Sequence, residues 1–380
     1  MQWKVRFIDY PAQYRSIEDE LMGTIKDVLS KGDLILRKHV RDFEEHLAVF
    51  VGTRYAVGVS NCTDGLMLAL RAAGIGPGDE VITVSHTFVA SVAAIHHVGA
   101  TPVLVDIGDD HLMDVGGLQA AITPRTRAIV PVHLNGRLCD MGRLMEIAQK
   151  HNLLVIEDAA QALGGSYEGK RGGSFGLAGC FSFYPAKILG AMGDAGAVVT
   201  NSEELANRVR LARDHGRTPD GDIAAWSFNC RLDNLQAAIL DLKLKYVPSW
   251  VNRRREIAQR YHRLLSPLRQ LLLPPAPDAS GLRYDVFQNY EVEADDRDRL
   301  VAHLKESGVE ILIPSAGKAV HQFAALGLSH FRLPRTERLF RQVLLLPLNP
   351  ELKDTEVDFV AHTIRNFYAG AQTSAVSTSG

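Results

Sequence analysis

Val155-Ile156-Glu157-Asp158-Ala159-Ala160-Gln161 is the stretch that decides the fold. It begins as an apolar run, predicted as a strand over Leu153–Ile156, and then changes to two acids and two small residues. A short apolar run of this kind is typical of a buried strand, and ligands of open α/β sheets bind at the carboxyl ends of such strands. A carboxylate at this place can cap a helix, bind a metal or hold the proton on a heterocyclic nitrogen. Helix capping is the commonest of these roles.

The same strand-then-helix pattern extends on both sides of this stretch. Strands are predicted over Tyr55–Val59, Glu80–Val84, Thr101–Asp106 and Ala128–His133, and later over Gly179–Phe183 and Ala195–Thr200. The segments between the earlier strands have helical periodicity and lie over Asp64–Ala73, Ser91–His97, Val115–Ala121 and Met141–His151. Strands joined by helices in this way indicate an α/β fold, with a mostly parallel sheet covered on both faces.

A second, smaller α/β unit follows the sheet. Long helices are predicted over Glu203–Asp214 and from Asn234 through Trp250 to Leu265. We therefore predict a large domain over residues 1–247, which includes the N-terminal helices, and a small C-terminal domain over residues 248–368. The tail, residues 369–380, has Val376 as its one bulky apolar residue and is predicted to be disordered.

Composition narrows the class of partner. The 380 residues carry 42 lysines and arginines against 44 acids, a net charge of −2, so no basic surplus favours nucleic acid or an anionic membrane. The 4 cysteines include no C-x-x-C pair, so no metal site is expected. The N-terminus lacks the apolar segment of a signal peptide, and no run of about 18 apolar residues occurs. We expect a cytoplasmic protein that acts on a small molecule.

Ser60-Asn61-Cys62-Thr63-Asp64-Gly65 lies between a predicted strand and a predicted helix. Hydroxyl groups and free N–H groups at a helix N-terminus form an anion site, which would suit a phosphate. The alternative is an ordinary helix cap supplied by Thr63 or Asp64.

Cys180-Phe181-Ser182-Phe183-Tyr184-Pro185-Ala186-Lys187 places a lysine in an apolar and aromatic context. Lysine is seldom buried without a partner, and desolvation lowers the pKa of its amine and makes it a usable nucleophile. The alternative is a lysine whose ammonium reaches solvent along an apolar stem. Gly190–Gly196 follows as a glycine-rich loop that would let backbone approach a ligand.

One further pattern is misleading. Gly172-Gly173-Ser174-Phe175-Gly176 matches the G-x-S-x-G motif of serine hydrolases. That motif needs a strand before it and a helix after it. Glu168–Arg171 and Leu177–Gly179 fit neither, so a connecting loop is predicted.

Together, three stretches identify a family. Glu157–Ala162, Phe181–Lys187 and Asn229–Ala238 resemble, in order and spacing, the DegT/DnrJ/EryC1/StrS family of sugar aminotransferases. The resemblance extends from about Phe7 to Tyr368. It implies the aspartate aminotransferase fold (fold type I of the pyridoxal-phosphate enzymes), whose large domain has a mostly parallel seven-stranded sheet flanked by helices.

The resemblance also implies a cofactor, pyridoxal 5′-phosphate, and roles for four side chains. Lys187 would form the Schiff base with the cofactor, and Asp158 would pair with the pyridine nitrogen and keep it protonated. Gln161 would form a hydrogen bond with the ring hydroxyl, and Phe88 would stack on the ring face. Lys187 would also transfer the proton, as general base and then acid.

The phosphate group would be held by residues of two subunits. Thr63 and Asp64, through the helix N-terminus, and the hydroxyl of Ser182 would bind it from one chain. Asn229 would reach it from the neighbouring subunit, so the functional unit would be a homodimer with shared active sites. Arg231 is a further candidate, for a substrate carboxylate or a phosphate.

By the same resemblance, L-glutamate is the amino donor and a keto sugar, probably carried on a nucleotide, is the acceptor. The cofactor would pass through its pyridoxamine phosphate form. Such sugars serve polysaccharide or antibiotic biosynthesis. Three branches of the family remain as alternatives: sugar dehydratases, which have histidine where Lys187 stands, synthases of an aminated aromatic ring, and non-catalytic regulators.

The sequence departs from the family pattern at several places. Cys62 stands where glycine is frequent, Ala195 where the loop after the lysine often has glycine, and Ser227 replaces another glycine. Asn135 occupies a position that is often tyrosine, and Ala319-Val320-His321 stands for a Pro-Leu-His. Since these positions are where a sugar or glutamate could touch the protein, Asn135 and His321 join Arg231 as substrate candidates.

Overall fold

The computed structural model describes residues 3–277 and 281–377 and is organised around a seven-stranded sheet. The strand order is β1-β9-β8-β5-β4-β2-β3, and β9 runs antiparallel to both of its neighbours while the other pairs are parallel. This confirms the predicted mostly parallel sheet. The strands are β1 (Tyr55–Val59), β2 (Glu80–Val84), β3 (Thr101–Val105), β4 (Thr126–Ile129), β5 (Leu154–Asp158), β8 (Ala178–Ser182) and β9 (Gly196–Thr200).

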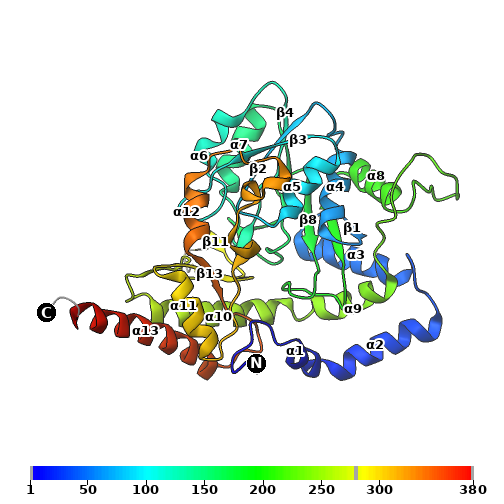
Figure 1. Ribbon diagram of the computed structural model, residues 1–380. Helices are drawn as coiled ribbons and strands as arrows, with labels where there is room; N and C mark the ends of the chain where they lie inside the picture. Colours follow the sequence, from blue (N-terminus) through cyan, green and yellow to red (C-terminus); the bar gives the residue numbers. More distant parts are fainter. Residues whose placement is uncertain (1–2, 278–280, 378–380) are drawn as a thin grey trace.

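Helices cover both faces of this sheet (Figure 1). Successive residues of β8 show why: Cys180 packs in a core cluster with α4 and α8, and Phe181 packs in a different cluster with α3 and α9. The period of two residues turns neighbouring side chains to opposite faces, so a strand buried on both sides is apolar throughout. The helices are α3 (Lys38–Val51), α4 (Cys62–Ala72), α5 (Val89–His97), α6 (Val115–Leu118), α7 (Met141–Lys150), α8 (Glu203–Arg213) and α9 (Asn234–Leu244).

A smaller unit is built on the antiparallel sheet β10-β12-β13. Its strands are β10 (Leu271–Leu272), β12 (Tyr290–Ala294) and β13 (Val343–Leu346), and its helices are α10 (Val247–Leu265), α11 (Arg297–Glu306) and α13 (Asp354–Ser377). Figure 1 shows α10 and α13 beside one another below the large sheet, and both contribute to the same core.

Two segments cross the predicted division at residue 247. Val5 belongs to the core of the smaller unit and bridges to Val309, so the N-terminal strand segment packs with the C-terminal part of the chain. In the other direction, α12 (Pro334–Gln342) places Leu339 and Phe340 in a cluster with the large sheet. The core of the smaller unit therefore includes Val5, whereas α12 packs with the large sheet, and the boundary at residue 247 stays a prediction.

The N-terminal helices before α3 are α1 (Tyr10–Ser16) and α2 (Glu18–Lys31). Two predicted elements differ from the structure at their ends. The long helix predicted from Asn234 to Leu265 is divided into α9 and α10, and α10 begins with Pro248 in its first turn, where the missing N–H of proline costs nothing. Finally, α13 continues to Ser377, where disorder was predicted from residue 369, because extending an existing helix needs no new nucleation. Residues 378–380 of that tail lie outside the described residues.

Short elements connect the two units. The strands β6 (Ser166–Tyr167), β7 (Lys170–Arg171) and β11 (Arg283–Tyr284) form a third small sheet. Single turns of 3-10 helix occur at η1 (Gln119–Ala121), η2 (Leu134–Gly136), η3 (Pro314–Gly317), η4 (Val320–Gln322) and η5 (Ala324–Leu326). Within residues 3–277 and 281–377, no helix has the length and apolar character needed to cross a membrane.

Candidate active site

Asp158 ends β5 at the carboxyl edge of the large sheet, as the sequence predicts. Its side chain is 5% exposed and accepts two hydrogen bonds. The hydroxyl of Ser91 on α5 donates to Oδ2 at 2.6 Å, and the N–H of Ala160 donates to Oδ1 at 3.2 Å. Thr87 lies 2.7 Å from Ser91, oxygen to oxygen. The carboxylate is thus fixed in direction by two donors.

Lys187 lies in the turn that follows β8, close to Asp158. Burial lowers the pKa of its amine, and the negative charge of Asp158 and the nearby Cys62 act in the opposite direction. Within the described chain, its Nζ has no hydrogen bond or ion pair. The structure therefore holds a desolvated amine near a carboxylate.

Gln161 follows Asp158 on the same loop, and its amide is oriented by the segment around Asn135. The Asn135 N–H donates to Gln161 Oε1 at 2.6 Å, and Asn289 Nδ2 lies 3.5 Å from the same oxygen. Since a backbone N–H can only donate, the oxygen of the amide is assigned without ambiguity. This orientation leaves the Nε2 group of Gln161 as a donor for a ligand.

The N-terminus of α4 meets the same edge of the sheet. The cap is Asn61, whose Oδ1 accepts from the Asp64 N–H at 2.9 Å, and not Thr63 or Asp64 as the capping interpretation expected. The Asp64 carboxylate is turned back and accepts from Asn61 Nδ2 at 2.8 Å and from the Ser60 hydroxyl. Thr63 lies half-buried in the first turn, where helix N–H groups have no partner within the helix.

Ser182 lies beside this helix end because of a close backbone approach. It pairs with Gly196 on β9, and a Cβ at Gly196 would lie 2.5 Å from the backbone carbon of Asn61. The Ser182 Oγ accepts from the Tyr184 N–H at 3.3 Å. Strand β8 therefore places Ser182 next to the α4 N-terminus, as expected of two elements that would hold one phosphate.

Three predicted site residues are less buried than Asp158. They are Phe88, Asn229 and Arg231. Phe88 precedes α5 and is 67% exposed, and Asn229 is exposed beside Asp214, with which it forms an isolated bridge. Arg231 forms an ion pair with Asp214 at 3.1 Å. Within the described residues, no hydrogen bond joins the Asn229 side chain to Thr63, Asp64 or Ser182, and its predicted contact with the phosphate stays a prediction.

His321 is placed differently from its predicted role. It is 3% exposed, and both ring nitrogens have partners: Nδ1 lies 2.7 Å from the Ser85 hydroxyl and Nε2 lies 3.3 Å from Glu337. A histidine that joins the end of β2 to α12 in this way offers no free ring nitrogen to a substrate. The role of His321 as a substrate contact stays a prediction, and it would require one of these two partners to give way.

Glu157, the acid next to Asp158, has a structural environment that sequence reasoning missed. It is fully buried and accepts from His133 Nε2 at 2.9 Å. Three backbone N–H groups of the glycine loop, at Gly173, Phe175 and Gly176, also donate to it at 2.7–2.8 Å. The loop that matches G-x-S-x-G therefore binds a buried carboxylate through its backbone N–H groups. This agrees with the prediction that the loop does not carry a serine nucleophile.

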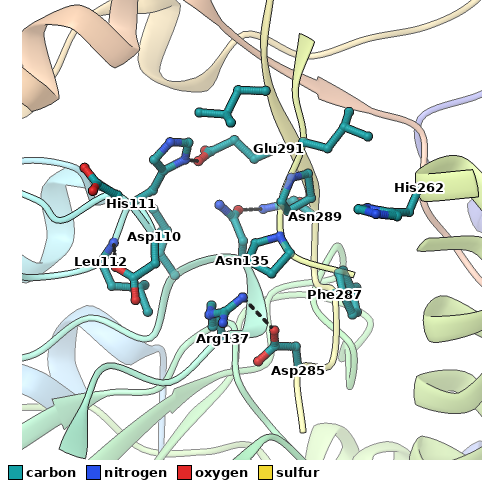
Figure 2. A pocket seen from close by; sticks show the side chains of 16 residues that line it. Asp110, His111, Leu112, Asn135, Arg137, His262, Asp285, Phe287, Asn289 and Glu291 are labelled. Carbon is teal, nitrogen blue, oxygen red and sulfur yellow. Dashed lines mark hydrogen bonds and ion pairs between the residues drawn. The ribbon is translucent and has the colours of Figure 1, made fainter. Parts of the chain in front are cut away.

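A pocket of about 280 Å³ has Asn135 among its lining residues (Figure 2). Asn289 Nδ2 donates to Asn135 Oδ1 at 2.9 Å in its centre, and Arg137 is paired with Asp285 at 3.2 Å. Most of its polar groups are therefore engaged with one another. Its lining residues are Asp109, Asp110, His111, Leu112, Leu134, Asn135, Arg137, His262, Leu272, Leu273, Pro274, Pro275, Asp285, Phe287, Asn289 and Glu291.

The described residues fit pyridoxal phosphate by the chemistry of their donors. The unpartnered amine of Lys187 suits an aldehyde, and the carboxylate fixed by Ser91 suits a pyridinium nitrogen. The amide donor of Gln161 suits a ring hydroxyl, and the helix N-terminus suits a phosphate. No group of three or more His, Cys, Asp and Glu side chains that could hold a metal ion occurs in the described ranges.

Comparison with known proteins agrees with this chemistry. The DegT/DnrJ/EryC1/StrS aminotransferase family matches residues 15–365. The chain is 40% identical to the "Pleiotropic regulatory protein" of Geobacillus stearothermophilus, over 96% of this chain and 98% of that one. It is also 40% identical to the dTDP-3-amino-3,4,6-trideoxy-alpha-D-glucose transaminase of Streptomyces venezuelae, over 96% of each chain.

Solved structures show the same fold. The S. venezuelae protein DesV, in complex with a ketimine intermediate, superposes with a TM-score of 0.91 at 39% identity, over 96% of this chain and 98% of that one. The PLP form of a putative sugar aminotransferase from Streptococcus pneumoniae gives a TM-score of 0.85 at 26% identity, over 91% and 95%. Fold, site and relatives define an aminotransferase of the pyridoxal-phosphate type. The chain belongs to the DegT/DnrJ/EryC1/StrS aminotransferase family.

Proposed function

We propose that this protein transfers the amino group of L-glutamate to a nucleotide-linked keto sugar, with pyridoxal 5′-phosphate as its cofactor. The observation that carries the proposal is the half-buried, unpartnered amine of Lys187 near the fixed carboxylate of Asp158. When bound, the cofactor supplies an electron sink for the amino carbon. Related sugar transaminases support the acceptor class.

Each residue of the site has one task in this proposal. Asp158 holds the ring nitrogen protonated, Gln161 donates to the ring hydroxyl and Phe88 covers one face of the ring. The amine of Lys187 would take the proton from the amino carbon of the donor and deliver it to C4′ of the bound cofactor, which its lowered pKa favours. Thr63, through its helix N–H group, and Ser182 would bind the phosphate. The Asp64 N–H, which donates to Asn61 Oδ1 in this structure, would have to leave that cap to take part.

We further propose that two copies of the chain form shared sites. The segment between α8 and α9 extends away from the body of the molecule (Figure 1) and carries Trp226, which is 96% exposed. Asn229 stands exposed at the base of this segment. Exposed aromatic residues on a projecting segment are typical of an interface, and a second copy would bring Asn229 to the phosphate and Arg231 or Asn135 toward the substrates.

The chemistry is tested by a half-reaction. The purified protein, loaded with pyridoxal phosphate, is mixed with L-glutamate, and one equivalent of 2-oxoglutarate per site is expected before any acceptor is added. Lys187→Ala should release none. A protein that binds both molecules without producing 2-oxoglutarate would be a regulator, and the proposal would be wrong.

The shared site is tested by mixing two inactive variants. Lys187→Ala and Asn229→Ala chains are unfolded or dissociated together and reassembled. A mixed dimer has one site with both residues intact, so about a quarter of the wild-type activity should return. Activity that stays at the sum of the two parents would show that each chain completes its own site.

A further inference from the structure

The side chain of Gln288 lies against the backbone on both sides of Lys187. Its Oε1 accepts from the Ile188 N–H at 2.9 Å, and its Nε2 donates to the Ala186 carbonyl at 2.8 Å. One backbone group can only donate and the other can only accept, so the orientation of the amide is fixed. Gln288 is 6% exposed and has no part in the proposed chemistry.

Gln288 is itself held by two other parts of the molecule. Its N–H donates to the Asn135 carbonyl at 2.9 Å, and Asn135 in turn orients Gln161. Its carbonyl accepts from Arg254 Nη1 on α10 at 3.1 Å. The segment that enters β12 is therefore bonded to the lysine turn on one side and to the Gln161 loop on the other.

We propose that Gln288 is a positioning residue for Lys187, which fixes the turn so that the amine remains directed toward Asp158 and the cofactor. This inference rests on the proposed role of Lys187. A lysine has four rotatable side-chain bonds, and a displacement of about 1 Å at a reacting group can cost about 100-fold in rate. The two hydrogen bonds from Gln288 fix the peptide groups on either side of Lys187 and so limit the movement of its backbone.

The same loop offers a matched control. Gln236 on α9 makes the same two-bond contact with Met192: its Oε1 accepts from the Met192 N–H at 2.9 Å and its Nε2 donates to the Met192 carbonyl at 3.0 Å. Gln236→Met removes the same pair of bonds from the loop, but away from the peptide groups of Lys187. Gln288 is buried, whereas Gln236 is half-buried and Met192 is exposed, so the free energy of unfolding of both variants is measured beside the rate to separate a structural effect from a positioning effect.

The test measures attachment of the cofactor to Lys187 and not turnover. Cofactor-free wild type, Gln288→Met and Gln236→Met are mixed with pyridoxal phosphate, reduced with borohydride at set times, and the modified Lys187 peptide is counted by mass spectrometry. We expect attachment to be about 10-fold slower in Gln288→Met and within about 2-fold of wild type in Gln236→Met. Non-covalent affinity, measured on a Lys187→Ala background, should be unchanged because the phosphate anchors are elsewhere.

Other outcomes are distinguishable. Equal rates in all three proteins, or equal slowing in both variants, would overturn the role of Gln288 and leave the proposed function standing. No modification of Lys187 in wild type would overturn the proposed function, and this inference with it. If Gln288→Met does not fold, Gln288→Glu serves instead: it keeps the acceptor for Ile188 and loses the donor to Ala186, so it should also slow attachment.

Discussion

Glu157 and Asp158 are adjacent acids at the end of one strand, yet their surroundings are opposite. Glu157 is saturated: His133 and three N–H groups of the glycine loop donate to it within one chain. Asp158 accepts from Ser91 and Ala160 and also lies near Lys187, whose amine has no partner. Alternation along the strand sends one carboxylate into the fold and the other to the site. Two carboxylates of the same chemistry therefore have different roles: Glu157 stabilises the fold and Asp158 belongs to the proposed active site.

The sharpest way to break this comparison is to remove the amine near Asp158. Lys187→Ala should lower kcat by at least about 10⁴-fold, because the group that transfers the proton is lost. Thermal stability should not fall, since no hydrogen bond of Nζ is removed. A variant that is unstable and still active would contradict the assignment.

Glu157→Gln should lower the stability of the fold and leave turnover nearly unchanged, the reverse of Lys187→Ala. Its carbonyl oxygen can accept from some of the present donors, but its NH₂ group would face others, leaving buried N–H groups unpaired. We expect a loss of about 3 kcal/mol in the free energy of unfolding, measured in urea. Protein that remains folded at low temperature should keep turnover within a few-fold of wild type. A large loss of kcat in fully folded protein would place Glu157 in the chemistry.

Ser91→Ala should leave the orientation of the Asp158 carboxylate less restricted. It removes the 2.6 Å hydrogen bond to Oδ2 and leaves the Ala160 N–H bond in place. We expect kcat to fall about 10-fold and the KM for glutamate to change little, because substrate does not touch this hydroxyl. Ser91→Thr keeps the donor and should restore most of the loss. Equal defects in the two variants would show that packing, and not the hydrogen bond, is responsible.

The smallest effect concerns stability and pH. Burial lowers the pKa of Lys187 in the folded protein below its unfolded value, so the unfolded chain binds the proton more tightly. The cost to stability is complete below the folded pKa and disappears as the pH rises to the ordinary lysine value of about 10.4. Cofactor-free Lys187→Met should therefore be more stable than wild type at pH 7, and the difference should shrink in alkaline buffer. A difference that is constant with pH would contradict the desolvated amine.

Much of this site could be predicted because it is local in the sequence. Asp158, Ser182 and Lys187 follow apolar strands, and the bounds of β1 and β2 agree with the periodicity. Ser91 was missed although it lies one helical turn after Thr87, since nothing local shows which carboxylate a hydroxyl will meet. His133 and Gln288 were missed for the same reason: their partners are distant in the chain.

The contacts of His321 could not be predicted for a similar reason. It was singled out by a family pattern, but its contacts with Ser85 and Glu337 come from tertiary packing. The start of α10 at Val247 could have been predicted, because Pro248 is tolerated only in a first turn. Local rules thus predict strand ends and helix starts, whereas the partners of buried polar groups require the fold.

The most direct test of the central claim is the visible absorption of the protein with bound pyridoxal phosphate, before and after addition of L-glutamate. Wild type should be yellow and lose that band as the cofactor accepts the amino group. Lys187→Ala should lack the band, and Glu157→Gln should behave as wild type wherever it is folded. A wild type that takes up no cofactor, or a Glu157→Gln protein that loses the response while folded, would contradict the division of tasks between the two acids.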